Sequence, residues 1–166
     1  MTLADDRLDA QFAFLMEADR LKQVLRATTL ADGSRRENSG EHSWHLALYA
    51  LVLADQAAPG VSIDRVIRML LIHDLVEIDV GDVPIHSQNG AAHGSTETQA
   101  AEAKAADRIF GLLPSDLATD LRALWEDFET AESPDARFAN RCNGADFRLQ
   151  AYGPSPVVAR IAVGLP

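Results

Sequence analysis

A chain of 166 residues, 47% of them hydrophobic, is long enough to bury a core and too apolar to be disordered. Its formal net charge of −10 excludes a protein that binds nucleic acid through a basic face, because such a face must replace the counterions of the phosphates. Its single cysteine excludes an internal disulfide framework and indicates a reducing compartment. The acidic N-terminal stretch is no signal peptide, and no apolar run approaches the roughly 20 residues of a membrane span, so we expect a cytoplasmic protein.

Apolar residues at three- and four-residue steps predict a first helix from Leu8 to Leu25. A polar loop with two glycines follows from Thr28 to Glu41, and Pro59 with Gly60 ends the helix after it. Asp79 to Ser95 contains three glycines and is predicted as a second loop. The other predicted helices cover residues 42–57, 62–78, 96–113, 114–130 and 134–152, and Ser62 is expected to cap the helix over 62–78.

This pattern predicts an all-α fold, a single-domain bundle of about six helices that spans residues 1–166. No linker divides the chain, and neither a run of strands nor an internal repeat is visible in the sequence. Three prolines and two glycines from about residue 153 onward predict an irregular tail.

The stretch "LLIHDLVEIDVGDVP", Leu70–Pro84, places acids and a histidine within an apolar helix. Ionised carboxylates are costly to bury without a partner, and a divalent cation would be such a partner. His73 and Asp74 project about 100° apart, so both can reach an ion that lies between their directions. Imidazole and carboxylate together favour Zn, Mn, Co or Fe. Glu77, one turn further, is placed to act as a general base or to orient a ligand.

A second histidine cluster strengthens this metal interpretation, because a lone His-Asp pair is also common as an ordinary capping or ion pair. In "ENSGEHSWH", His42 and His45 lie three residues apart on one helical face. Two histidine-bearing helices of a small bundle can converge on one ion. For His45 by itself, a position at the rim or in the core is the favoured interpretation.

The motifs "RRENSGEHSWH" and "IHDLVEIDVGD" together resemble the HD-domain metal-dependent phosphohydrolases, and within them the 5′-deoxynucleotidase-like branch. The resemblance covers the chain from about Leu21 to about Gln150, and the joint signature is far more specific than "HD" alone. It implies the all-helical HD-domain fold, a homodimer, and an enzyme that removes phosphate from nucleoside 5′-monophosphates.

Carried onto this sequence, the resemblance implies one divalent cation, Mn, Co, Zn, Mg or Fe, with His42, His73 and Asp74 among its ligands. Glu77 corresponds to the residue that activates or positions the attacking water. Asp82 in "VGD" corresponds to a second catalytic acid near the substrate and its leaving group.

The resemblance also implies that Arg26 holds the substrate, and it leaves Arg35 and Arg36 as alternative phosphate-binding residues in the loop before the second helix. An aromatic residue usually follows this arginine in the bacterial deoxynucleotidases. Here Ala27 follows, so the sequence does not predict selectivity for deoxynucleotides.

The last metal ligand of the family is an aspartate that follows an "ARFA"-like stretch. An ungapped alignment of "ARFANRCNGADFRLQ" places Asn143 there, whereas the context "ADFRLQ" favours Asp146 after a short insertion. We expect Asp146 to complete the metal sphere, because an amide is a weaker ligand than a carboxylate. Gly144 lies between the two positions, and its low helix propensity predicts a local kink or a break in the helix.

The expected reaction is the attack of an activated water on phosphorus, with a small nucleotide as the binding partner and neither nucleic acid nor a membrane. Two alternatives stay open. One is a catalytically weak HD-fold binding or regulatory protein. The other is a different HD phosphohydrolase or a diiron oxygenase. The oxygenase needs additional ligands, for which His86 and His93 are candidates, although a mobile surface loop is the favoured interpretation of their segment.

Overall fold

The computed structural model describes residues 3–82 and 96–152. The expected tail from about residue 153 and the candidate ligands His86 and His93 lie outside the described residues. The chain divides into two compact units, and the expectation of a single domain stays a prediction. Unit 1 combines Met1–Arg26, Asn38–Gly40 and Asp74–Ala123, and unit 2 combines Ala27–Glu37, Glu41–His73 and Leu124–Pro166.

Helices make up most of the described residues, which confirms the predicted all-α fold class. The helices are α1 (Leu3–Ala18), α2 (Ser39–Val52), α3 (Ile63–Ile72), α4 (Glu77–Val80), α5 (Thr96–Phe110), α6 (Ser115–Thr130) and α7 (Pro134–Tyr152). Single 3-10 turns form η1 (Asp19–Gln23), η2 (Ala54–Gln56) and η3 (His73–Val76). Of the kink or break expected at Gly144, the break is wrong, because α7 runs through that residue, and the kink stays a prediction. Within the described ranges, no helix has both the length and the apolar character needed to cross a membrane.

A pair of short strands is the main difference from the predicted elements. β1 (Leu25–Thr29) and β2 (Arg36–Asn38) form a two-stranded sheet in the segment predicted as a helix end and a loop. The β-branched Thr28 and Thr29 favour an extended backbone. Gly33, with a φ of 71°, adopts the left-handed conformation that the turn between the strands requires. The predicted first helix therefore ends early, at Ala18, and its last residues form η1 and the first residue of β1.

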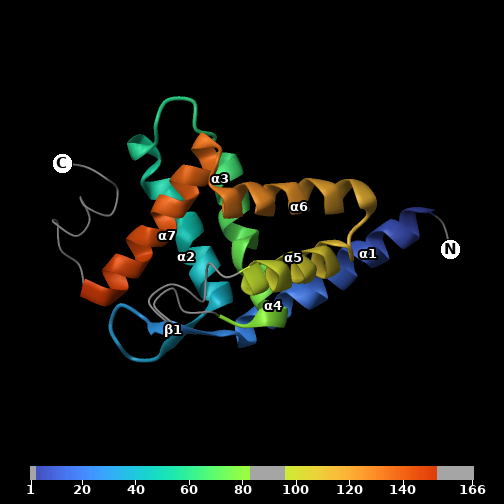
Figure 1. The fold of residues 1–166 in the computed structure, drawn as a ribbon, viewed down its shortest axis with the longest axis horizontal. Coiled ribbons are helices and arrows are strands. Elements are labelled where there is room, and N and C mark those ends of the chain that lie inside the picture. The colour runs from blue at the N-terminus through green and yellow to red at the C-terminus, as the bar shows by residue number, and fades with distance from the viewer. Residues whose placement is uncertain (1–2, 83–95, 153–166) are drawn as a thin grey trace. The chain divides into compact units, whose positions relative to one another are not determined.

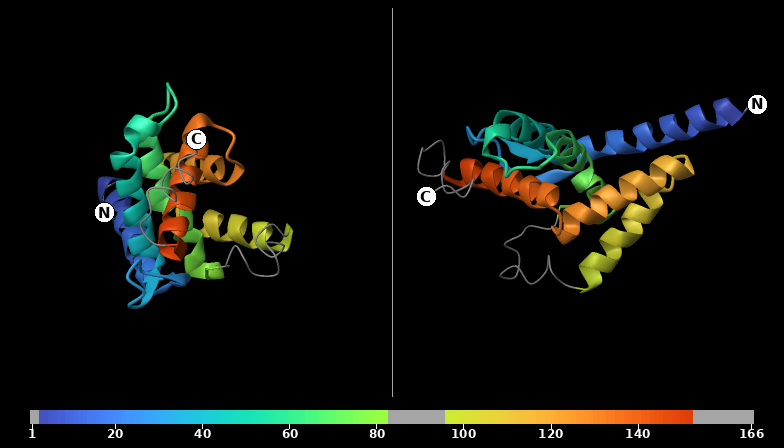
Figure 2. Two further views of the ribbon diagram at one scale, coloured as in Figure 1. Left: turned by 90° about the vertical axis from the view of Figure 1, so that its left-hand side faces the viewer. Right: turned by 90° about the horizontal axis from the view of Figure 1, so that it is seen from above.

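In unit 1, α5 lies beside α4 and contacts α1 (Figures 1 and 2). The Phe14 ring of α1 stacks on Phe110 of α5 with centroids 6.3 Å apart, and both rings are buried. Arg108 of α5 pairs with Glu17 of α1 at 2.6 Å and with Asp79 of α4 at 2.5 Å. The apolar contact joins α5 to α1, and the ion pairs of Arg108 link α5 to both α1 and α4.

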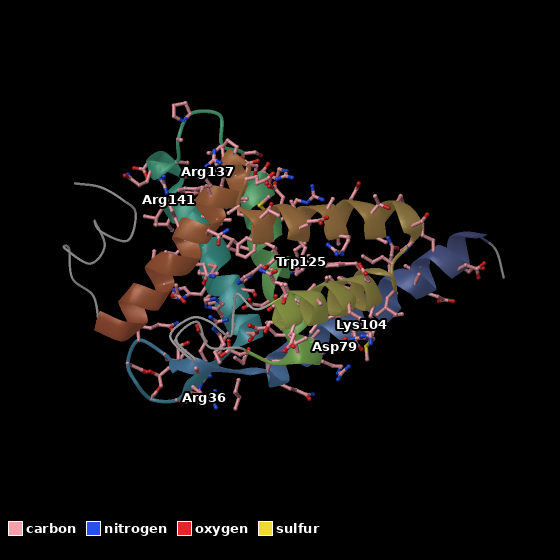
Figure 3. The ribbon with its side chains drawn as sticks, viewed as in Figure 1. Arg36, Asp79, Lys104, Trp125, Arg137 and Arg141 are labelled. Carbon is pink, nitrogen blue, oxygen red and sulfur yellow. The ribbon has the colours of Figure 1, made fainter. Side chains whose placement is uncertain are left out.

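In unit 2, α3 packs along α7 (Figure 1). The apolar face that α3 buries consists of Val66, Met69 and Leu70. The predicted cap of α3 is confirmed, because the Ser62 side chain accepts a hydrogen bond from the Arg65 backbone N–H at 3.4 Å. Trp125, labelled in Figure 3, donates its indole N–H to the His73 carbonyl at 3.1 Å. This bond ties α6 to the end of α3.

Candidate functional site

His73, the first residue of η3, is buried and held in one orientation. Its Nδ1 lies 2.9 Å from the Leu70 carbonyl oxygen, so in the neutral ring Nδ1 donates a hydrogen bond and Nε2 carries the lone pair. The Phe128 ring packs against the imidazole, with centroids 4.9 Å apart. A histidine fixed in this tautomer is prepared to bind a cation through Nε2. The predicted His-Asp motif therefore begins a 3-10 turn rather than continuing a helix.

His42, in the first turn of α2, lies beside His73 within unit 2. The two ring centroids are 5.7 Å apart, and the residues are only 2% and 3% exposed. His42 Nδ1 lies 3.0 Å from Asp146 Oδ2, and Nε2 lies 3.2 Å from Asn143 Oδ1. The structure thus brings together two of the predicted ligands and both candidates for the last one.

A pair of buried carboxylates faces the Nδ1 side of His42. Asp146 is fully buried, and Glu37, whose Oε2 lies 3.3 Å from Nδ1, is 2% exposed. Gln150 Nε2 donates to Glu37 Oε2 at 2.8 Å and to Asp146 Oδ2 at 2.9 Å. His45 lies at the rim, with Nδ1 3.1 Å from Asp146 Oδ1. These contacts supply the hydrogen-bond donors that a carboxylate needs once it leaves water.

In unit 1, the acids that follow the histidine motif surround an arginine. Arg26 Nη1 lies 2.8 Å from Asp74 Oδ2 and 3.8 Å from Glu77 Oε1. All three side chains are largely buried. The predicted substrate arginine therefore lies together with one predicted metal ligand and with the predicted base.

A contact that was not predicted from the sequence holds Glu77. Ser39 is fully buried and donates its hydroxyl to Glu77 Oε2 at 2.5 Å. Burial and the charge of Asp74 raise the pKa of Glu77 to about 8, and the charge of Asp82 acts in the same direction. The Ser39 hydroxyl and Arg26 partly offset this rise in pKa. A carboxyl group whose pKa lies near neutral pH is suited to accept and return a proton.

The other two predicted phosphate-binding arginines lie at the two-stranded sheet. Arg35 pairs with Glu41 at 2.5 Å, and its side chain is 54% exposed. Arg36 is the first residue of β2 and is exposed (Figure 3). Binding of a phosphate by Arg35 would compete with its bond to Glu41.

Three residues of these clusters were missed by the sequence reasoning: Ser39, Glu37 and Gln150. Ser39 and Glu37 stand in "ENSGEH" at the start of a helix, where polar residues usually serve as exposed caps. Their burial was therefore not predictable from that pattern. Gln150 lies four residues after Asp146, and this spacing on one helical face was a signal that could have identified it.

The donor set of unit 2 fits a divalent cation. His42 and His73 contribute buried imidazoles, and Asn143 places an amide oxygen at the Nε2 atom of His42. Such nitrogen and oxygen donors suit Zn, Mn, Co or Fe. The possible ligand atoms of Glu37, His42 and Asp146 also lie within 4.8 Å of one another. The assignment of individual ligands stays a prediction.

Comparisons with known sequences agree with the motif. The sequence model of the HD domain family matches residues 18–155. The human protein named 5′-deoxynucleotidase HDDC2 is 32% identical over 139 residues, which cover 83% of this chain and 65% of the human protein. The chain therefore spans slightly less than two thirds of the length of this relative. The Photorhabdus temperata protein named 5′-deoxynucleotidase yfbR is 28% identical, over 72% of this chain and 62% of that protein.

Solved structures share the fold. A crystal structure from Magnetospirillum magnetotacticum MS-1, described as a predicted metal-dependent phosphohydrolase, is 48% identical with a TM-score of 0.81 and covers 89% of this chain and 74% of that chain. The cyanophage S-2L HD phosphohydrolase DatZ, described as bound to dA and one catalytic Zn²⁺ ion, is 22% identical with a TM-score of 0.54 and covers 89% of this chain and 76% of that chain. At that identity DatZ supports the fold alone. Because the family model matches most of the sequence, this chain belongs to the HD domain family.

Proposed function

We propose that this protein is a metal-dependent phosphohydrolase that removes phosphate from deoxynucleoside 5′-monophosphates. The observation that carries the proposal is the buried pair of His42 and His73, the second of which directly precedes Asp74 in the His-Asp motif. The relatives named 5′-deoxynucleotidase support the substrate class.

In this proposal His42, His73 and Asp74 hold one divalent cation, and a residue of α7 supplies the fourth ligand. Asp146 is the fourth ligand predicted from the sequence, and Asn143 competes with it. The cation is Mn, Co, Zn, Mg or Fe. When bound, it supplies Lewis acidity and lowers the pKa of water.

Glu77 accepts the proton of the attacking water. Because Ser39 donates to Oε2, the other carboxylate oxygen, Oε1, is the one that receives the proton. The raised pKa allows Glu77 to keep this proton near neutral pH and to return it to the leaving alcohol. Asp82 assists at the leaving group.

Arg26 binds the phosphate. Its guanidinium contacts Asp74, and a cation on Asp74 would weaken that ion pair. The N–H groups of Arg26 then become available for phosphate oxygens. Local positive charge is needed, because the formal net charge of −10 repels a nucleotide at long range. Arg35 and Arg36 are additional phosphate-binding residues in this proposal.

A phosphate-release screen tests this function. The protein is stripped with a chelator and reloaded separately with Mn, Co, Zn, Mg or Fe, and then assayed on ribonucleoside and deoxynucleoside monophosphates. We expect metal-dependent release from the deoxynucleoside 5′-monophosphates, and none from the matched 3′-monophosphates. Absence of release from every nucleotide with every cation would contradict the proposal.

A second candidate function is a binding or regulatory protein that keeps the metal but turns over slowly. It is favoured by Asn143, a neutral amide at the Nε2 atom of His42. Stoichiometric metal binding without phosphate release from any nucleotide would support this function. Pyrophosphate and phosphodiesters in the same screen test other HD phosphohydrolases, and oxygen uptake by the iron-loaded protein tests a diiron oxygenase.

We also propose that the protein acts in the cytoplasm as a homodimer. Large apolar side chains on α1 are more than half exposed: Leu8, Phe12, Leu15 and Met16. Beside them lies a pocket of about 380 Å³ that Leu113 and Leu117 help to line. Burial of this face in a dimer would remove apolar surface from water. Light scattering on the 18.0 kDa chain distinguishes a dimer from a monomer.

A further inference from the structure

The two ring nitrogens of His42 meet different partners. Nδ1 lies 3.0 Å from Asp146 Oδ2, and Nε2 lies 3.2 Å from Asn143 Oδ1. An ionised carboxylate only accepts hydrogen bonds, so the Nδ1 of a neutral His42 carries the ring proton. The lone pair of the ring is then on Nε2 and points to the side of Asn143.

We propose that Asp146 orients His42 and that the amide oxygen of Asn143 is the fourth ligand of the cation. This inference rests on the proposed metal site. Two lone pairs that face one another repel, and a cation bound by both atoms removes this repulsion. Adjacent ligands that each lie about 2.1 Å from one ion are separated by roughly 3.0–3.4 Å, and the 3.2 Å between His42 Nε2 and Asn143 Oδ1 falls in this range.

Asp146 is placed to hold the ring and not to bind the cation that the ring binds. Asp146 Oδ2 accepts a hydrogen bond from His42 Nδ1. When an imidazole binds a cation through Nε2, its Nδ1–H points away from that cation, so Asp146 lies on the opposite side of the ring. Gln150 Nε2 donates to both Asp146 and Glu37. This N–H group occupies the space between the two carboxylates where a cation would otherwise bind. Asp146 and Glu37 therefore hold the His42 ring in one orientation from its Nδ1 side.

The consequence is a weakened metal site that one substitution can strengthen. An amide oxygen is neutral, whereas a carboxylate adds a charge that attracts the cation. Asn143 is only partly buried, so a carboxylate of the same size fits there. Asn143→Asp is therefore expected to tighten cation binding.

The test is the affinity of the chelator-stripped protein for Co²⁺. This affinity is measured from the visible absorption of bound Co²⁺ and by calorimetry. We expect Asn143→Asp to bind Co²⁺ at least about tenfold more tightly than the wild type, and Asn143→Ala to bind more weakly. Gly144→Asp is the matched control, since it adds the same charge one residue away. A Cβ at Gly144 meets no atom within 4 Å, so its affinity should stay within about twofold of the wild type.

Asp146 is tested as a positioning residue by two variants. Asp146→Asn keeps an oxygen that accepts the Nδ1 proton and should retain stoichiometric binding. Asp146→Ala removes the acceptor and should weaken binding by about 10- to 100-fold, the usual scale for the loss of such a partner. Nitrogen-15 NMR of the metal-free protein should show His42 protonated on Nδ1 in the wild type and in Asp146→Asn. In Asp146→Ala the proton should shift toward Nε2.

Two results decide the outcome. Loss of stoichiometric Co²⁺ in Asp146→Asn, with no gain in Asn143→Asp, would make Asp146 the ligand and overturn the inference. His73→Ala separates this failure from a failure of the proposed function. It should lose Co²⁺ whichever residue of α7 is the ligand, and binding as tight as in the wild type would overturn the proposed metal site itself.

Discussion

The two carboxylate clusters of this protein stabilise their buried charge by different means. In unit 1, Arg26 contacts Asp74 with a guanidinium whose charge does not change with pH. In unit 2, Asp146 accepts from the His42 ring and the Gln150 amide, which are single, directed N–H groups. In the first cluster, burial and the charge of Asp74 raise the pKa of Glu77, and Arg26 offsets only part of this rise. In the second cluster, the contacts of Asp146 fix the orientation of the His42 ring. Substitution of Glu77 or Ser39 in the first cluster should therefore change proton transfer, and substitutions in the second cluster should change metal affinity. Substitution of Asp74, which is also a proposed metal ligand, should change both.

The largest expected effect comes from Asp74→Ala, which removes both a proposed metal ligand and the partner of Arg26. We expect elemental analysis of the folded variant to find no stoichiometric metal, and phosphate release to fall below detection. Asp64→Ala, at an exposed position in the first turn of α3, is the control and should keep both. Full retention of metal in Asp74→Ala would remove Asp74 from the proposed site.

Glu77→Gln should separate chemistry from metal binding. The amide keeps the shape of the side chain but cannot accept a proton. We expect metal content to survive and turnover to fall by about 10²-fold or more, the usual scale for loss of a general base. An unchanged rate in the metal-loaded variant would exclude Glu77 from proton transfer.

The pH dependence of stability provides a smaller but direct test of the raised pKa. The folded-state pKa of Glu77, about 8, lies above its ordinary value of 4.5, so the folded protein holds this proton more tightly than the unfolded chain does. Its contribution to stability is complete below pH 4.5 and is lost as the pH rises to about 8. The metal-free Glu77→Gln variant should therefore gain stability relative to the wild type between pH 5 and pH 9, by about 2–4 kcal/mol at most.

Urea unfolding in the presence of chelator measures this difference at each pH. A constant difference in the free energy of unfolding across the range would contradict the raised pKa.

The smallest expected effect is that of Ser39→Ala, which removes the hydroxyl that donates to Glu77. Since this bond lowers the pKa of Glu77, its loss should raise that pKa further. The rising limb of the pH–rate profile should move to higher pH, and the maximum rate should change only several-fold. Ser39→Thr keeps the hydroxyl and should have the pH–rate profile of the wild type. If Ser39→Ala also has the wild-type profile, Ser39 does not act through Glu77.

Helix positions were predictable because the apolar spacing that marks a helix is local. The predicted segment 134–152 matches α7, and the Ser62 cap forms as expected. The two short strands were not predicted, because their pairing depends on a partner segment across a turn. The turn at His73 was missed for a related reason, since the apolar pattern of an α-helix continues through it.

The sequence by itself determined the family motif and its ligand chemistry, because His73 and Asp74 are neighbours in the chain and "EHS" is a local pattern. Only the tertiary structure decided which nitrogen of His42 meets Asp146, 104 residues away, and which hydroxyl meets Glu77, 38 residues from Ser39. The reason is physical. A hydrogen bond depends on the distance and direction between two atoms, and for residues far apart in the chain these are set by how the helices pack.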